Sequence, residues 1–116
     1  VCLRSDSRIG LAVALNQGFC VNVLPEGARS LADRFSGLYD TEQPDRFGAV
    51  NFIEGPTGPV LEGATAFECI LDNIITHGSH DICIGNVRSV TKCDRLPLTY
   101  MDGGFHIVRP EAKNQD

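Results

Sequence analysis

The feature that most constrains the fold is a pair of long apolar runs separated only by Thr76-His77-Gly78-Ser79. The first run covers positions 64–75 and the second covers 80–90. Within the first run two sets of side chains alternate, Phe67, Cys69 and Leu71 with Glu68, Ile70 and Asp72. That period of two predicts a strand whose first set is buried. Strands joined by a short loop pair antiparallel, so we expect a long β-hairpin whose second strand forms one wall of a barrel, with His80 at its rim.

Two helices are expected before this hairpin. Ser5-Asp6-Ser7 are residue types that favour a helix N-cap, and the apolar spacing after them predicts a helix over about 8–17, stopped by Gly18. A second helix is expected over about 28–35 and ends at Gly37.

The remaining elements are expected to be strands with short connections. Residues 19–24 are apolar except for Asn22, which predicts a central, buried strand. Residues 38–47 are expected to form an acidic loop, and shorter strands are expected at 49–54, 60–61, 98–101 and 105–108. Helices gathered at one end of an antiparallel sheet fit a small closed or split β-barrel.

The chain length predicts one mainly β domain over residues 1–110, followed by a polar tail over 111–116. The sequence begins within a strand, at Val1-Cys2-Leu3. We therefore expect that an N-terminal segment, with a barrel strand, is missing from it.

Composition argues against several kinds of partner. The ten Lys and Arg residues are scattered and outnumbered by fifteen Asp and Glu, which speaks against nucleic acid. No apolar run approaches the roughly 20 residues that a membrane-spanning helix needs. The five cysteines show no C-x-x-C spacing, so we expect reduced, buried thiols in a cytoplasmic protein and no metal site.

The residues before the first helix are candidates for binding an anion. A helix N-terminus offers unpaired N–H groups and a partial positive charge, and Arg8 adds a guanidinium there. The alternative is that Ser5, Asp6 and Ser7 only cap the helix and that Arg8 is a solvated surface residue. Both interpretations remain open at the level of sequence.

Three further features each allow a structural and a functional interpretation. The buried amide of Asn22 needs partners, either the edge of a heterocycle or a neighbouring backbone. Asp45-Arg46-Phe47 is either a solvated charge pair beside an aromatic ring or a cover for a ligand. His80 is either an ordinary surface histidine or a functional one, histidine being the side chain whose charge changes near neutral pH. No pairing of nucleophile and base, no G-x-G-x-x-G and no P-loop accompanies it.

Seven short motifs follow one another along the chain: Cys2-Leu3 with Ser7-Arg8, then residues 18–24, 31–37, 45–47, 58–64 with Glu68-Cys69, 78–87 and 97–105. In this order and spacing they resemble the short-chain flavin reductase family, the NAD(P)H-dependent FMN or FAD reductases with an FMN-binding split barrel. The resemblance extends from Val1 to about Pro110. It does not include the Ser/Thr-rich front segment that binds flavin in that family.

The resemblance implies a role for each candidate. The residues implied to line the flavin phosphate, or the rest of an FAD, are Ser5, Asp6, Ser7 and Arg8. Asn22 is implied to lie near the isoalloxazine ring, and Asp45, Arg46 and Phe47 near the flavin edge or a subunit interface. His80 is implied to be the catalytic residue on the nicotinamide side, with Tyr100, Gly103 and Phe105 lining the same cleft.

The implied activity is hydride transfer from NADH or NADPH to FMN or FAD by a homodimer that supplies reduced flavin to a monooxygenase. Such an enzyme stacks two planar rings and needs no nucleophile of its own. Two alternatives use the same barrel. One is a non-catalytic FMN-binding electron carrier or sensor, and the other is a barrel without a ligand that only binds a partner.

Overall fold

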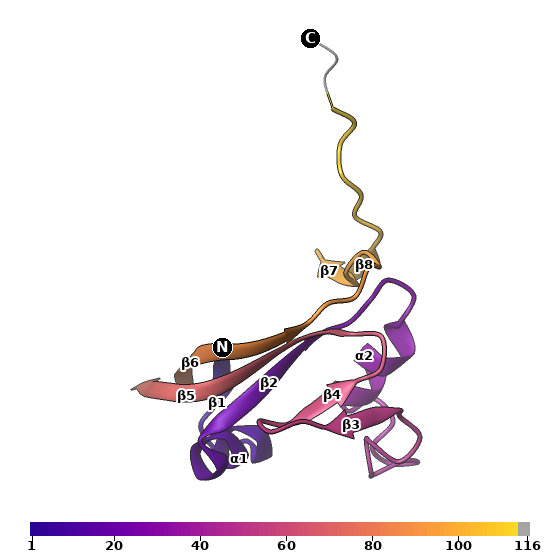
Figure 1. Ribbon diagram of the computed structural model, residues 1–116. Helices are drawn as coiled ribbons and strands as arrows, with labels where there is room; N and C mark the ends of the chain where they lie inside the picture. Colours follow the sequence, from indigo (N-terminus) through magenta and orange to yellow (C-terminus); the bar gives the residue numbers. More distant parts are fainter. Residues whose placement is uncertain (114–116) are drawn as a thin grey trace.

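The fold is a curled antiparallel sheet flanked by two helices and two short hairpins, as the computed structural model in Figure 1 shows. The structure describes residues 1–113. Along the chain the elements are β1 (Cys2–Arg4), α1 (Arg8–Asn16), β2 (Gly18–Val23), α2 (Arg29–Phe35), β3 (Phe52–Glu54), β4 (Pro59–Leu61), β5 (Thr65–His77), β6 (His80–Thr91), β7 (Thr99–Met101) and β8 (Gly104–His106). The mainly β, antiparallel class predicted from the sequence is confirmed.

The long hairpin expected from the two apolar runs is the centre of the main sheet. β5 and β6 pair antiparallel from Ala66–Thr91 to His77–His80, with Gly78 and Ser79 as the turn. Gly78 has a φ of +59°, a conformation that glycine adopts without the steric penalty of a side chain. β1 and β2 flank the pair in the order β1-β6-β5-β2, and the sheet curls into half a barrel.

The core lies between the sheet, α1 and the β3–β4 hairpin. Its buried apolar residues are small or branched: Val13, Val60, Leu61, Ala64, Ala66, Cys69 and Cys83. The β7–β8 hairpin projects from the sheet and contacts the start of α2, where the Arg29 guanidinium lies 4.9 Å from the centre of the Phe105 ring. No helix among residues 1–113 has the length and apolarity to cross a bilayer.

Three local predictions are wrong. Gln17, with a φ of +59°, caps α1 in place of Gly18, which already belongs to β2. β2 is an edge strand of the described sheet and is half-buried, because only β5 pairs with it along its length. Glu68 was expected to face solvent, yet it is buried, because the β3–β4 hairpin covers that face of β5.

The cysteines agree with their prediction only in part. All five are free, and Cys69 and Cys83 are buried as expected. Cys20 and Cys93 are half-buried, whereas Cys2 is exposed because β1 is the other edge of the sheet. Residues 107–113 have no regular secondary structure, and the rest of the predicted 111–116 tail lies outside the described residues.

Candidate functional site

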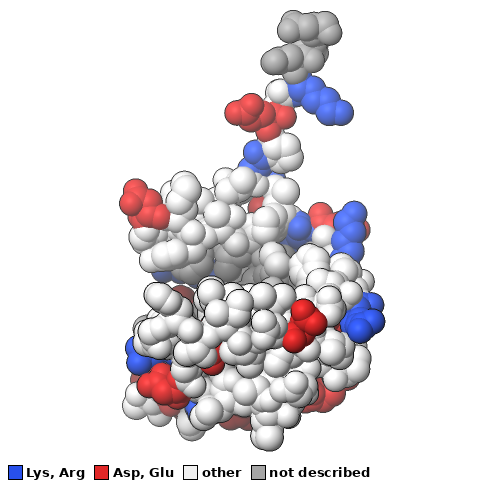
Figure 2. Space-filling model, turned by 90° about the vertical axis from the view of Figure 1, so that its left-hand side faces the viewer, with Lys and Arg blue, Asp and Glu red and all other residues white. Residues whose placement is uncertain are grey.

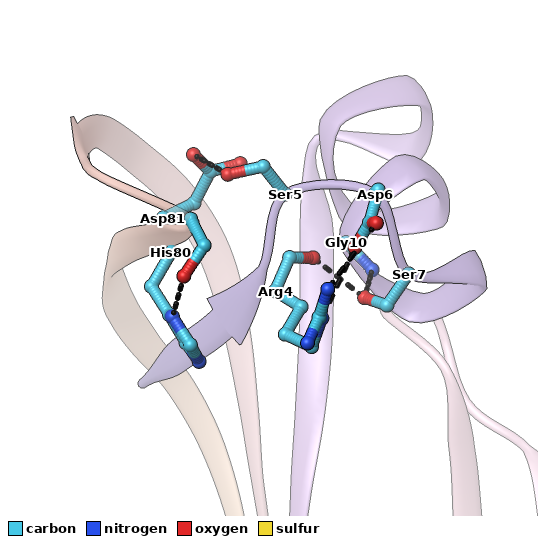
Figure 3. Close-up of polar contacts among 8 residues, drawn as sticks. Arg4, Ser5, Asp6, Ser7, Gly10, His80 and Asp81 are labelled. Carbon is cyan, nitrogen blue, oxygen red and sulfur yellow. Dashed lines mark hydrogen bonds and ion pairs between the residues drawn. The ribbon is translucent and has the colours of Figure 1, made fainter.

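His80 and the loop before α1 meet at one end of the sheet. Arg4 on β1 pairs with His80 on β6, and the Ser5 amide donates to the Ser79 carbonyl at 3.0 Å. The Ser79 hydroxyl and His80 Nδ1 are 2.9 Å apart (Figure 3). The exposed histidine thus has one ring nitrogen fixed by its neighbour, and it stands beside the loop that carries Ser5, Asp6 and Ser7.

A carboxylate that the sequence reasoning missed joins the loop to the hairpin. Asp81 Oδ1 accepts hydrogen bonds from the Ser5 hydroxyl at 2.9 Å and from the Thr76 hydroxyl at 2.7 Å. Thr76 pairs with Asp81 across the two-residue turn, so the hairpin register was the signal that could have identified both residues. These bonds hold the His80 end of β6 against the loop.

The loop caps α1 and leaves its N-terminus suited to an anion. Ser7 Oγ accepts from the Gly10 amide at 3.0 Å and donates to the Arg4 carbonyl at 2.7 Å (Figure 3). No acidic residue occupies the first turn of the helix. Asp6 is exposed, and its pKa is lowered by the hydrogen bond and the charge of Arg4, which lies 3.2 Å away. Ser7 therefore caps the helix, as the structural alternative predicted. The remaining N–H groups of the first turn can still bind an anion.

A cavity of about 280 Å³ lies beside the start of α1, where Ile9 is its first lining residue. Its lining comes from α1, β2 and the residue after it, α2, the loop before β3, and β4: Ile9, Cys20, Asn22, Leu24, Phe35, Phe47, Pro59 and Leu61. The cavity is mostly apolar and contains two of the predicted site residues, Asn22 and Phe47. The Phe35 and Phe47 rings meet edge to face with centroids 5.0 Å apart, which gives it an aromatic wall. The other lining residues were not predicted, since they come together only through folding.

The Asn22 amide is used to join two strands. Its Nδ2 donates to the Pro59 carbonyl at 2.9 Å, and its Oδ1 accepts from the Leu61 amide at 2.9 Å. The interpretation of Asn22 as a partner of neighbouring backbone is therefore correct. Its side chain lines the cavity, but its polar atoms are already bonded to β4.

Arg46 is likewise engaged within its own loop. Its guanidinium binds Asp40 through two hydrogen bonds of 2.8 and 3.0 Å and donates to the Phe35 carbonyl at 3.0 Å. The hydrogen bond from Arg46 lowers the pKa of Asp40, and the charge of Arg8 acts in the same direction. A side chain at Gly37 would begin 3.0 Å from Arg46 Nη2, so glycine leaves room for this pair. Asp45 accepts from the Phe47 amide at 3.0 Å and thereby turns Phe47.

The residues predicted to line the nicotinamide side together with His80 do not lie near it. Tyr100, Gly103 and Phe105 lie on the β7–β8 hairpin, after the end of β6 that is opposite to His80. β6 contains 12 residues, which span roughly 40 Å at the usual rise of an extended strand. The expectation that His80 and this hairpin line the same cleft is wrong within one chain, because a whole strand separates them. Among residues 1–113, no cluster of three or more His, Cys, Asp or Glu side chains could hold a metal ion.

Comparison with known proteins identifies the class. The family model for the flavin reductase like domain matches residues 1–109. An FMN reductase (NADH), RutF, of an Enterobacter species is 35% identical over 95% of this chain and 76% of its own. The reductase subunit HsaB of a flavin-dependent monooxygenase from Rhodococcus jostii is 31% identical over 95% of this chain and 56% of its own.

A solved structure agrees with the sequence comparison. The NADH:FAD oxidoreductase SgcE6 of Streptomyces globisporus, in complex with NAD and FAD fragments, superposes with a TM-score of 0.85 at 25% identity. The match covers 97% of this chain and 68% of that one. The chain belongs to the flavin reductase-like domain family, which confirms the resemblance and the split-barrel fold expected from it.

Proposed function

We propose that this chain is the core of a flavin reductase that transfers hydride from NADH or NADPH to FMN or FAD. The observation that carries the proposal is the family match over residues 1–109. In this chain the matched region holds an aromatic-walled cavity directly after Ser7-Arg8. The neighbouring relatives are named as FMN and FAD reductases that use NADH.

The residues present fit a flavin. The mostly apolar cavity suits a planar ring, and the N-terminus of α1 with Arg8 suits a phosphate at its edge. Phe47 and Asn22 would line the ring, while Ser5, Asp6, Ser7 and Arg8 would hold the phosphate end. Because Arg4 already pairs with Asp6, the Asp6 carboxylate adds less repulsion toward an anion.

The chain's own contribution is orientation. When bound, a flavin supplies the acceptor for a hydride from the nicotinamide. His80, fixed through Nδ1, would contact the nicotinamide at the edge of this site, since the loop beside His80 bonds to β6 at Ser5 and reaches the cavity at Ile9. Asp45 and Arg46 would act indirectly, by placing Phe47 and α2.

The partners are part of the same proposal. We infer a homodimer, in which Tyr100, Gly103 and Phe105 face the cleft of the second copy, and a monooxygenase that consumes the reduced flavin. The relatives that are reductase subunits of monooxygenases support the second inference.

We also infer that the protein is cytoplasmic, because its five free cysteines suit the reducing environment of the cytoplasm.

The test is steady-state oxidation of NADH and NADPH by the full-length protein with FMN, FAD and riboflavin in turn. Turnover with at least one flavin and one nicotinamide is expected. The proposal fails if no combination is oxidised. A retained flavin without turnover would instead identify an electron carrier or sensor.

A further inference from the structure

Glu68 is the one charged residue that is buried among residues 1–113. It lies on β5, opposite Cys20 of β2, with 8% of its surface exposed. Its Oε1 atom is buried and has no hydrogen-bond partner in the described part of the chain. A buried polar oxygen without a partner is unfavourable by more than a typical hydrogen bond contributes, so its presence calls for a physical reason.

A four-residue turn, 55–58, covers this carboxylate, and we call it the strap. The Gly55 amide donates to the Gly58 carbonyl at 2.9 Å, which closes the strap on itself. A side chain at Gly55 would collide with Glu68 Oε1, so the strap lies directly on the carboxylate. Thr57, in the middle of the strap, also has a buried hydroxyl oxygen without a partner.

The two unpartnered groups are chemically complementary. A carboxylate oxygen accepts a hydrogen bond, and a threonine hydroxyl can donate one. Both lie under the strap on the same stretch of the β2–β5 pair, because Thr57 lies against Gly18 and Gly55 lies against Glu68, whose partner on β2 is two residues after Gly18. Burial, and secondarily the charge of Glu68, raises the pKa of the Cys20 thiol opposite.

The strap is continuous with the wall of the cavity. Pro59 follows it directly, and both Pro59 and Leu61 line the cavity and bond to Asn22. A side chain at Gly58 would begin 3.5 Å from Cys20 Cβ, so the end of the strap lies beside Cys20, another lining residue. A shift of the strap therefore moves the β4 side of the cavity.

We propose that the strap has two positions, and that a flavin in the cavity selects a closed one in which the Thr57 hydroxyl donates to Glu68 Oε1. The present structure corresponds to the open position, in which the strap covers Glu68 but the Thr57 hydroxyl is not hydrogen-bonded to it. Closure pairs the buried carboxylate and presses β4 onto the ligand, so ligand binding and strap closure reinforce each other. This inference rests on the proposed function, since it takes the ligand to be a flavin.

The first test measures FMN binding to the full-length protein by quenching of flavin fluorescence. Thr57→Val keeps the shape of the side chain and removes the donor. We expect about a tenfold weaker FMN affinity, the change that loss of one hydrogen bond to a charged acceptor produces. Glu68→Gln, which keeps the shape but weakens the acceptor, should weaken binding less. The matched control, Thr41→Val on an exposed loop, should bind as the wild type does.

The second test follows amide hydrogen exchange over residues 55–61 with and without FMN. FMN should slow exchange there in the wild type and in Thr41→Val, and much less in Thr57→Val. Circular dichroism of each variant verifies folding, and a fold defect in Thr57→Val would transfer the test to Glu68→Gln. Wild-type affinity and wild-type protection in Thr57→Val would overturn the strap alone. Failure of the wild type to bind any flavin would overturn the proposed function.

Discussion

His80 differs from the other histidines in what surrounds it. Its strand pairs with β1, its Nδ1 is held by Ser79, and Asp81 beside it binds the loop before α1. His77 pairs with it across the turn but adjoins no such loop. A fixed imidazole next to the loop that we propose to hold the flavin phosphate can orient a second charged ligand, so its removal should affect the nicotinamide more than the flavin.

Replacing His80 with alanine should therefore impair nicotinamide use more than flavin binding. We expect the KM for NADH to rise about tenfold, as for the loss of one hydrogen bond, while the Kd for FMN changes less than twofold. Steady-state kinetics and flavin fluorescence give the two values. His77→Ala, at the same exposed hairpin end, is the control and should change neither. A loss of flavin affinity with unchanged NADH kinetics would show that His80 is misplaced.

The Asp40–Arg46 pair makes a prediction about pH. Arg46 lowers the pKa of Asp40 in the folded protein, so the pair contributes stability above the usual carboxyl range, and this contribution is lost as the pH falls through the lowered pKa. The free energies of unfolding of the wild type and of Asp40→Asn, measured in urea, should thus differ most near neutral pH and become equal in strong acid. A difference that is constant, or that grows on acidification, would mean that Asp40 gains nothing from Arg46 in the native state.

At the scale of elements, Asn22 attaches the β3–β4 hairpin to the main sheet. β4 contains three residues and pairs in the regular manner only with β3, so the two bonds from Asn22 supply its polar link to β2. Those bonds place Pro59 and Leu61 in the cavity wall. The stability of the hairpin position and the shape of the cavity consequently depend on one side chain.

Asn22→Ala should lower the free energy of unfolding by about 2 kcal/mol, because the carbonyl of half-buried Pro59 and the amide of buried Leu61 lose their partners. The same variant should weaken FMN binding, since the cavity wall is released. Urea unfolding measures the first effect and flavin fluorescence the second. Asn86→Ala, exposed on β6, is the control, with an expected change within about 0.5 kcal/mol. An Asn22→Ala protein as stable as this control would show that Asn22 does not attach the β3–β4 hairpin to the main sheet.

Local pattern predicted the elements well and their environment less well. The apolar runs, the Gly78-Ser79 turn and the capping residues at Ser5-Asp6-Ser7 predicted the long hairpin and α1, since each depends on nearby residues. The alternation around Glu68 failed, because a distant hairpin covers the polar face as well. Asn22 was left open for the same reason: its partners are 37 and 39 residues away along the chain.

At the scale of the whole molecule, the curled sheet leaves much apolar surface exposed. Ile84, Val87 and Val90 on β6 are 43%, 55% and 54% exposed. The side shown in Figure 2 is hollowed across its middle, and its charged residues lie mostly around this hollow. The hairpin with Tyr100 and Phe105 projects from the opposite end of β6 to His80. The family's motifs predicted these residues as one site, whereas a single chain holds them in two places.

The central claim is that this fold passes a hydride from a nicotinamide to a flavin. The most direct measurement mixes the full-length protein with FMN and NADH without oxygen and follows both absorbance spectra. The account predicts that NADH and oxidised flavin disappear together, one for one, and more slowly when NADH carries deuterium at the transferred position. A flavin that binds and keeps its oxidised spectrum in excess NADH would contradict it.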